Sequence, residues 1–185
     1  KIEFKIDNNK LTVLVDGGSL GARTINTTNL NSLSLFKQEK LNLIWQTGQH
    51  FSSIASYAVK ELSTDGISTF SFIKNIETAY TAADIIISRA GAIAISELCV
   101  IGKPVILIPS PNVAENHQFK NAQSLVNKNA ALLVKDSQAN DKLVLKIISL
   151  KNDSQLMKEL SVNIKTMEAK EASSIIASHA MSLIK

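Results

Sequence analysis

The stretch that decides the fold is Leu11-Thr-Val-Leu-Val15 followed by Asp16-Gly-Gly-Ser-Leu-Gly-Ala-Arg23. A short, apolar, β-branched run of this kind is typical of a strand that is buried on both faces. The glycine-rich turn after it leads into sequence of helical period from about residue 20 to residue 36. Such a turn favours phosphate binding, because glycine lets the backbone approach a phosphate and the helix end presents free N–H groups. A tight turn that needs glycine only for its positive φ is the alternative interpretation.

Five further apolar runs of the same kind follow along the chain, at 41–45, 68–72, 84–88, 104–108 and 131–134. The stretches between them have helical period, at 51–61, 77–83, 92–101, 116–128 and 138–150. This strict alternation predicts an α/β fold, a doubly wound parallel sheet of Rossmann type.

The strand signal stops after Asp136, and helical sequence continues at 140–150, 154–169 and 172–185. We therefore expect residues 1–150 to form one domain, with residues 151–185 as a helical C-terminal extension of it. The extension could pack on the sheet or reach across to a second domain, and the sequence leaves both arrangements open.

Composition narrows the class of protein. The 185-residue chain is 45% hydrophobic, which suits one compact domain with a continuous core. All but two of its 20 basic residues are dispersed lysines, and only 5% of residues are aromatic, a pattern that argues against nucleic-acid binding. No run reaches the roughly 18 apolar residues of a membrane-spanning helix, and the charged start is unlike a signal peptide, so we expect a soluble, cytoplasmic chain.

Metal and disulfide chemistry are not indicated. The single cysteine, Cys99, has no partner for an internal disulfide and lies in an apolar run typical of packing. There is no Asp-x-Asp pair and no His/Cys ligand spacing, so we expect neither a metal nor a cofactor. The three histidines are scattered over different elements, and no nucleophile-base constellation is evident.

A second strand-to-helix turn follows the run 84–88 and reads Arg89-Ala-Gly-Ala-Ile-Ala94. Because parallel strands end at one edge of a sheet, the two turns bring two helix N-termini to the place where open α/β sheets bind ligands. Two convergent turns suit a diphosphate better than either turn alone. Further along this helix, Glu97 could accept hydrogen bonds from ribose hydroxyls, and the alternative is a surface or ion-paired glutamate.

A third loop, polar and with two prolines, follows the run 104–108 and ends where a helix begins near Asn116. His117, Gln118 and Asn121 are spaced so that they share a face near the start of this helix. Their neutral donors and acceptors suit sugar hydroxyls. The alternative is helix capping by Asn116, with the other side chains solvated.

Together these motifs resemble the C-terminal half of the MurG family of glycosyltransferases. The resemblance covers about residues 10–136, in the family's order, through the segments 17–26, 45–48, 72–76, 79–84, 88–92, 96–97, 102–104, 117–118 and 121–122. Trp45 departs from the pattern, since many members have histidine before Gln46-Thr-Gly48.

The resemblance implies a donor site for UDP-N-acetylglucosamine. Ser19 and the two glycine-containing turns would hold the diphosphate, the main chain of Ile73 would pair with uracil, and Glu97 would bind the ribose hydroxyls. The third loop would hold the sugar. The full set implied for binding is Gly18, Ser19, Gly21, Ile73, Arg89, Gly91, Ala92, Ile93, Ala94, Glu97, His117, Gln118 and Asn121.

The resemblance also implies an inverting transfer of N-acetylglucosamine to the lipid-linked muramyl-pentapeptide precursor of peptidoglycan, lipid I. The enzyme would lie peripherally on the cytoplasmic face of the membrane. In the family, the other half carries the acceptor site, the membrane-facing surface and the catalytic base. We therefore expect no catalytic residue in this sequence, which alone should bind the donor without turning it over.

Three alternatives stay open. One is a natural donor-binding subunit whose acceptor half is a separate membrane protein. A second is a UDP-sugar epimerase, which would need acid/base carboxylates near the sugar, with Glu115 as the nearby candidate. The third is a nucleotide-binding module without enzymatic activity.

Overall fold

The computed structural model describes residues 4–18, 21–63 and 65–168. Its strands are β1 (Thr12–Asp16), β2 (Asn42–Gln46), β3 (Ile67–Phe70), β4 (Ile85–Ser88), β5 (Val105–Leu107) and β6 (Leu132–Leu133). The α-helices are α1 (Arg23–Asn31), α2 (Leu33–Gln38), α3 (Ser52–Glu61), α4 (Ile76–Ala82), α5 (Ala92–Ile101), α6 (His117–Val126), α7 (Ala139–Lys151) and α8 (Ser154–Lys165). Short 3₁₀ helices are η2 (Gln49–Phe51), η3 (Ala114–Asn116) and η4 (Asp136–Gln138).

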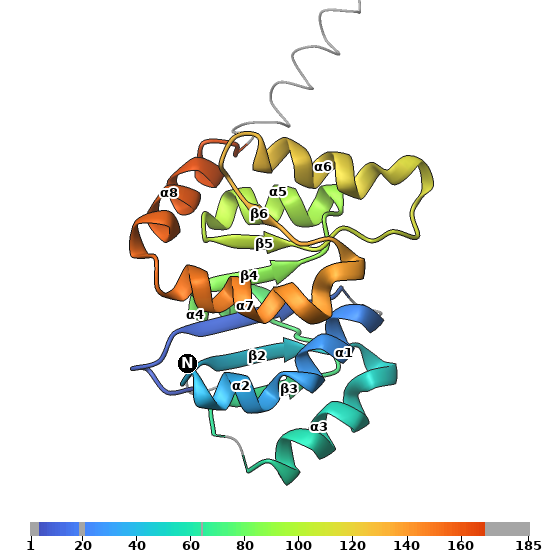
Figure 1. Ribbon diagram of the computed structural model, residues 1–185, viewed down its shortest axis with the longest axis vertical. Coiled ribbons are helices and arrows are strands. Elements are labelled where there is room, and N and C mark those ends of the chain that lie inside the picture. Colours follow the sequence, from blue (N-terminus) through green and yellow to red (C-terminus); the bar gives the residue numbers. More distant parts are fainter. Residues whose placement is uncertain (1–3, 19–20, 64, 169–185) are drawn as a thin grey trace, which may run out of the picture.

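All six strands form one parallel sheet in the order β3-β2-β1-β4-β5-β6 (Figure 1). This is the strand order of a Rossmann fold, and it confirms the predicted doubly wound α/β class. Each of the six apolar runs in the sequence overlaps one strand to within a residue or two, because a strand covered on both faces must be largely apolar.

The helix expected over residues 20–36 is divided into α1 and α2, which meet at Ser32. The sequence of α1 is rich in threonine and asparagine, whose side chains compete with the helical hydrogen bonds of the backbone. Asn29 illustrates this competition, because its Nδ2 donates to the carbonyl of Ile25 at 3.0 Å.

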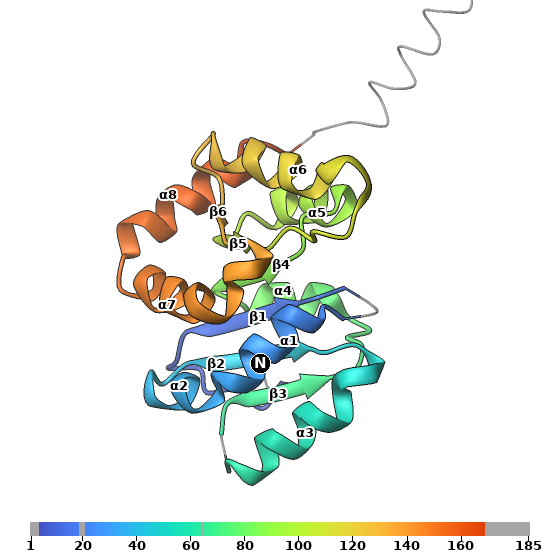
Figure 2. The same ribbon diagram turned by 45° about the vertical axis from the view of Figure 1, so that its right-hand side comes forward.

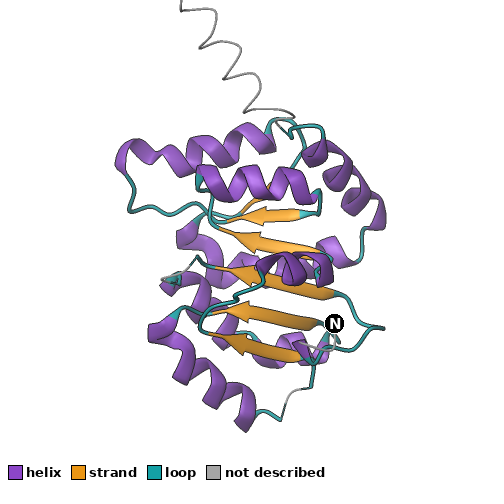
Figure 3. Cartoon of the chain, turned by 180° about the vertical axis from the view of Figure 1, so that it is seen from behind, coloured by secondary structure: helices purple, strands orange, loops and turns teal. Residues whose placement is uncertain are grey.

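Helices cover both faces of the sheet (Figures 1 and 3). Alternate residues of the central strands point into two separate apolar layers, one on each face. Val13 and Val15 of β1 face the layer that α1, α2, α3 and α7 cover. Leu14 faces the layer that α4, α5 and α6 cover. This alternation follows from the two-residue period of a strand, and it fixes which helices lie on which face.

Helix α8 packs against α5 and α7 and buries Leu160 and Ile164 (Figure 2). Its side chains reach both apolar layers, since Leu160 joins one and Ile164 joins the other. Of the expected extension 151–185, residues 169–185 lie outside the described residues. Within the described part of the chain, no helix has the length and apolar character needed to cross a bilayer.

Trp45 is a core residue that connects β2 to α1. Its side chain is completely buried and packs on the ring of Phe51, with centroids 5.9 Å apart. Its Nε1 donates to Oδ1 of Asn26 at 2.9 Å, while Nδ2 of Asn26 donates to the carbonyl of Thr47 at 2.6 Å. The residue that departs from the family pattern therefore has a packing role and a satisfied N–H group.

Gly21 makes the closest backbone approach in the turn after β1. Its φ is +75°, and an added Cβ would lie 2.2 Å from the carbonyl oxygen of Thr47. Gly18, in the same turn, also has a positive φ of +81°, but no heavy atom lies within 4 Å of a Cβ built there. Substitutions at these two glycines therefore distinguish the effect of backbone strain alone from the combined effect of strain and steric overlap.

We predict that Gly21→Ala lowers the free energy of unfolding by more than about 2 kcal/mol, because left-handed strain of ~1–2 kcal/mol adds to the clash with Thr47. Gly18→Ala, the matched control, should lose only the strain, about 1 kcal/mol. Urea denaturation of both variants and the parent gives the comparison. Equal losses would show that the approach to Thr47 does not constrain the turn.

Candidate functional site

The winding of the chain reverses at the centre of the sheet. From β1 the chain winds outward to β2 and β3, then crosses to β4 and winds outward to β5 and β6 on the other side. The carboxyl ends of all strands lie at one edge, and α1 and α5 begin there on opposite faces (Figure 1). Open α/β sheets bind their ligands at such a reversal point.

A cavity of about 540 Å³ opens at this edge. Its walls include five residues that the sequence predicted for ligand binding: Gly18, Ile73, Ile93, Ala94 and Glu97. Ile93 is 77% exposed, and Glu97 lies on the same face of α5. The structure therefore brings together residues from the first turn, the segment after β3 and the start of α5.

Six further residues complete the cavity, and sequence reasoning missed them: Asp16, Gln46, Phe72, Lys74, Ile76 and Tyr80. Asp16 and Gln46 are the last residues of β1 and β2, where a polar residue ends an otherwise apolar strand. That position was a usable signal, because side chains at the carboxyl ends of parallel strands line the ligand edge. Phe72 belongs to the motif segment 72–76, and it is 57% exposed.

A chain of hydrogen bonds runs beneath the cavity. Oδ1 of Asp16 accepts from the N–H of Gly18 and from Nε2 of Gln46, each at 2.8 Å. Oε1 of Gln46 accepts from the N–H of Ile73, also at 2.8 Å. Burial raises the pKa of the Asp16 carboxyl, and the two donated hydrogen bonds oppose that rise.

Tyr80 and Glu97 form a second polar contact in the wall. The Tyr80 hydroxyl donates to Oε2 of Glu97 across 3.4 Å, and the tyrosine is 3% exposed. Burial, and then the nearby Asp16 and Glu97 carboxylates, raise the pKa of Tyr80 well above its usual range. Its hydroxyl therefore stays protonated at physiological pH, and Glu97 retains free acceptor capacity.

The helix ends at this edge are open to an anion. Among the residues that the structure describes, no side chain caps the first turn of α1 or of α5, whose N-caps are Ala22 and Gly91. The first N–H groups of a helix have no partner within it, and together with the helix dipole they favour negative charge. Ser19, predicted to add a hydroxyl, lies outside the described residues. Gly21 does not line the cavity, and its N–H donates to the carbonyl of Gly18 at 3.0 Å.

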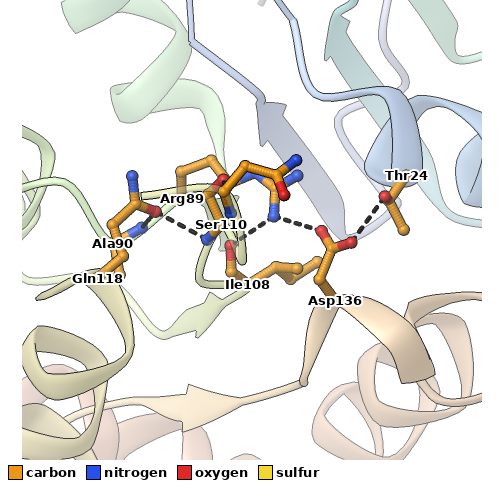
Figure 4. Close-up of polar contacts among 8 residues, drawn as sticks. Thr24, Arg89, Ala90, Ile108, Ser110, Gln118 and Asp136 are labelled. Atoms are coloured by element: carbon orange, nitrogen blue, oxygen red, sulfur yellow. Dashed lines mark hydrogen bonds and ion pairs between the residues drawn. The ribbon is translucent and has the colours of Figure 1, made fainter. Parts of the chain in front are cut away.

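Arg89 does not line the cavity, and its guanidinium contacts Asp136 (Figure 4). Its Nη1 donates to the carbonyl of Ile108 at 3.0 Å and pairs with Oδ1 of Asp136 at 2.5 Å. The other carboxylate oxygen of Asp136 accepts from the Thr24 hydroxyl at 2.8 Å. In this structure the guanidinium therefore joins the turn after β4 to β5, η4 and α1.

The start of α6 is tied to the turn after β4. Oε1 of Gln118 accepts from the N–H of Ala90 at 3.2 Å and of Ser110 at 2.9 Å (Figure 4). Nδ2 of Asn121 donates to the carbonyl of Ala90 at 3.2 Å. These bonds leave the amide nitrogen of Gln118 and the amide oxygen of Asn121 for a ligand.

His117 is exposed, and its Nδ1 lies 2.8 Å from the carbonyl of Ala114. Neither it nor the two amides of α6 line the 540 Å³ cavity. The alternative of capping by Asn116 is wrong, because this residue has left-handed backbone and its side chain makes no capping bond. Across the described residues, no three His, Cys, Asp or Glu side chains gather as they would around a metal ion.

Comparison with known proteins places the chain in a family. Residues 12–176 match the family model of the glycosyltransferase family 28 C-terminal domain. A relative from Phocaeicola vulgatus, UDP-N-acetylglucosamine--N-acetylmuramyl-(pentapeptide) pyrophosphoryl-undecaprenol N-acetylglucosamine transferase, is 46% identical over 175 residues, which are 94% of this chain and 46% of the relative. The chain spans about half the length of the curated relatives it matches.

Solved structures agree. The crystal structure of Acinetobacter baumannii MurG superposes with a TM-score of 0.83 at 26% identity, over 98% of this chain and 52% of that one. UDP-GlcNAc 2-epimerase from Neisseria meningitidis, bound to UDP-GlcNAc, has a TM-score of 0.65 at 15% identity, over 96% and 45% of the two chains, and shares the fold alone. The chain therefore belongs to glycosyltransferase family 28, in which it corresponds to the C-terminal domain of a MurG-like protein.

Proposed function

We propose that this chain is the donor-binding domain of the transferase that moves N-acetylglucosamine from UDP-N-acetylglucosamine to undecaprenyl-pyrophosphoryl-MurNAc-pentapeptide, converting lipid I to lipid II in peptidoglycan synthesis. The observation that carries the proposal is the cavity at the winding reversal, whose walls combine Glu97 and Ile73 with Gly18 of the turn before α1 and with Ile93 and Ala94 at the start of α5. The names and identities of the relatives support the choice of donor and acceptor.

The uridine would occupy the 540 Å³ cavity. Glu97 would accept hydrogen bonds from the ribose hydroxyls. The main chain of Ile73 would pair with uracil, with its carbonyl accepting from the ring N3–H. Phe72 and Ile93, both exposed at the cavity, would cover apolar surface of the nucleoside.

The diphosphate would lie between the first turns of α1 and α5. The motif residues proposed to contact it are Gly18, Ser19, Gly21 and the backbone from Gly91 to Ala94. Each helix end contributes about 0.3–1 kcal/mol toward an anion, so several contacts must act together. Helix ends and N–H groups would then offset the phosphate charge without a metal ion.

The sugar would be bound by the start of α6. The amide nitrogen of Gln118 is a free donor and the amide oxygen of Asn121 is a free acceptor, with His117 exposed beside them. We assign Arg89 a supporting role in place of a ligand contact, because its guanidinium is engaged by Asp136 and Ile108. It would hold the turn after β4 in position.

In the full-length enzyme, a muramyl hydroxyl deprotonated by a base on the other half would attack the anomeric carbon of the sugar. The bond to the diphosphate oxygen would break with inversion, and UDP would leave into the two helix ends that stabilise its charge. The other half would also carry peripheral association with the cytoplasmic face of the membrane. The present chain alone would bind the donor without turning it over.

Residues 151–185 would belong to the same domain as residues 1–150, since α8 packs on α5 and α7. The epimerase alternative has support from the shared fold. It is less favoured because the transferase relative is 46% identical over 94% of this chain, whereas the epimerase structure is 15% identical. A separate donor-binding subunit and a non-enzymatic module would use the same donor site.

We predict that UDP binding persists in EDTA, because helix N-termini and backbone N–H groups supply the positive potential around the diphosphate. Titration calorimetry of the chain with UDP, in EDTA and then with added magnesium, measures this directly. Binding that appeared only after addition of magnesium or manganese would overturn the metal-free proposal.

We predict that Glu97→Gln weakens UDP binding by about 1–3 kcal/mol, the range for a hydrogen bond to a charged group. Because Glu97 is exposed, the melting temperature should stay within a few degrees of the parent. Glu61→Gln, the same change at an exposed position on α3, is the matched control and should not alter binding. Equal affinity of the Glu97 variant and the parent would remove Glu97 from the site.

We predict that Asn121→Ala weakens binding of UDP-N-acetylglucosamine by about 1 kcal/mol, as for one neutral hydrogen bond, and leaves UDP affinity nearly unchanged. Calorimetry with both ligands gives the difference. Asn127→Ala, at an exposed position ending the same helix, should affect neither ligand. Parallel losses for both ligands would instead show that Asn121 acts through its bond to Ala90.

A further inference from the structure

Gln46 connects two segments of the site that are far apart in sequence. Its side chain is 4% exposed and lies between Asp16, at the end of β1, and Ile73, in the segment after β3. Asp16 in turn accepts from the N–H of Gly18. One buried amide therefore joins the turn that leads into α1 to the segment assigned to the base.

The contacts of Gln46 allow only one orientation of its amide. A carboxylate can only accept and a backbone N–H can only donate, so the NH₂ group must face Asp16 and the oxygen must face Ile73. A side chain that could not do both would leave a buried polar group unsatisfied, which is costly in a protein interior. The amide thus fixes the N–H of Ile73, and with it the peptide between Phe72 and Ile73, relative to Asp16.

We propose that Gln46 is a specificity-determining positioning residue. It holds the N–H of Ile73, which restrains the backbone of the residue whose carbonyl would recognise uracil, and it couples that residue to the glycine-containing turn through Asp16. This inference rests on the proposed function, because it requires a uridine nucleotide in the cavity. Uracil offers a donor at N3 where cytosine offers an acceptor. An Ile73 carbonyl that is restrained to face N3 therefore favours UDP over CDP.

The test is Gln46→Glu, which keeps the size of the side chain and removes its donor. At about pH 8 the new carboxylate at position 46 would face the carboxylate of Asp16. We therefore expect UDP affinity to fall about tenfold and the ratio of UDP affinity to CDP affinity to decrease. At about pH 5 a proton shared by the two carboxyl groups restores a donor, because burial and like charge raise the pKa of such a pair. UDP affinity and the preference should then return toward those of the parent.

The control is Gln38→Glu, the same change at an exposed position on α2. Affinities for UDP and CDP are measured by calorimetry for parent, variant and control at both pH values. Dividing each affinity by that of the parent at the same pH cancels the effect that titration of the nucleotide phosphates has on binding. Melting temperatures recorded alongside show whether each protein is folded.

A second variant keeps the proposal testable if Gln46→Glu folds poorly. In the double variant Gln46→Glu with Asp16→Asn, the donor and acceptor exchange places. The asparagine amide can donate to the new carboxylate, which still accepts from the N–H of Ile73. The N–H of Gly18 loses its acceptor when the asparagine NH₂ group faces the new carboxylate. We therefore expect this protein to recover the preference for UDP over CDP at about pH 8, with UDP affinity recovered only in part.

Several outcomes overturn the inference. A single variant with the affinity and preference of the parent at both pH values would show that Gln46 does not position the base-binding segment. Equal losses for UDP and CDP, without recovery at low pH or in the double variant, would reduce Gln46 to a packing role. Failure of the parent to bind UDP would overturn the proposed function itself, and with it this inference.

Discussion

The reversal of winding between β1 and β4 is the constraint on which the rest of the structure depends. β1 pairs with β2 on one side and with β4 on the other, and every strand of the sheet is parallel. The turns after these strands therefore meet at one edge, while α1 and α5 depart to opposite faces. The 540 Å³ cavity opens where these helices diverge. A local sequence motif could not produce this cavity, because it depends on the order of the strands.

Buried polar contacts then hold the turns around this space. On one side, Gln46 joins Asp16 to Ile73, and on the other, Gln118 joins Ala90 to Ser110. Behind the site, Arg89, Asp136 and Thr24 connect β4, η4 and α1 through one carboxylate (Figure 4). Because these groups are satisfied by one another, the loops gain a defined geometry without large apolar side chains.

The electrostatics of the site differ between its two ends. Asp16 and Glu97 place carboxylate acceptors in the cavity, and burial raises the pKa values of both Asp16 and Tyr80. The uncapped first turns of α1 and α5 supply positive potential instead. A ligand with hydroxyl donors at one end and phosphates at the other would be oriented by this polarity. A nucleoside diphosphate has that pattern, which is consistent with the proposed donor.

The sequence by itself determined the fold class, the six strands and several cavity residues, because these follow from local patterns. Strand periodicity, glycine between strand and helix, and the position of Glu97 on α5 are all legible within a few residues. Only the tertiary structure decided that Gln46 bridges Asp16 and Ile73, and that Arg89 and Gln118 are engaged inside the protein. These contacts join residues that are distant in sequence, so their partners depend on strand order and side-chain direction, which no local pattern specifies.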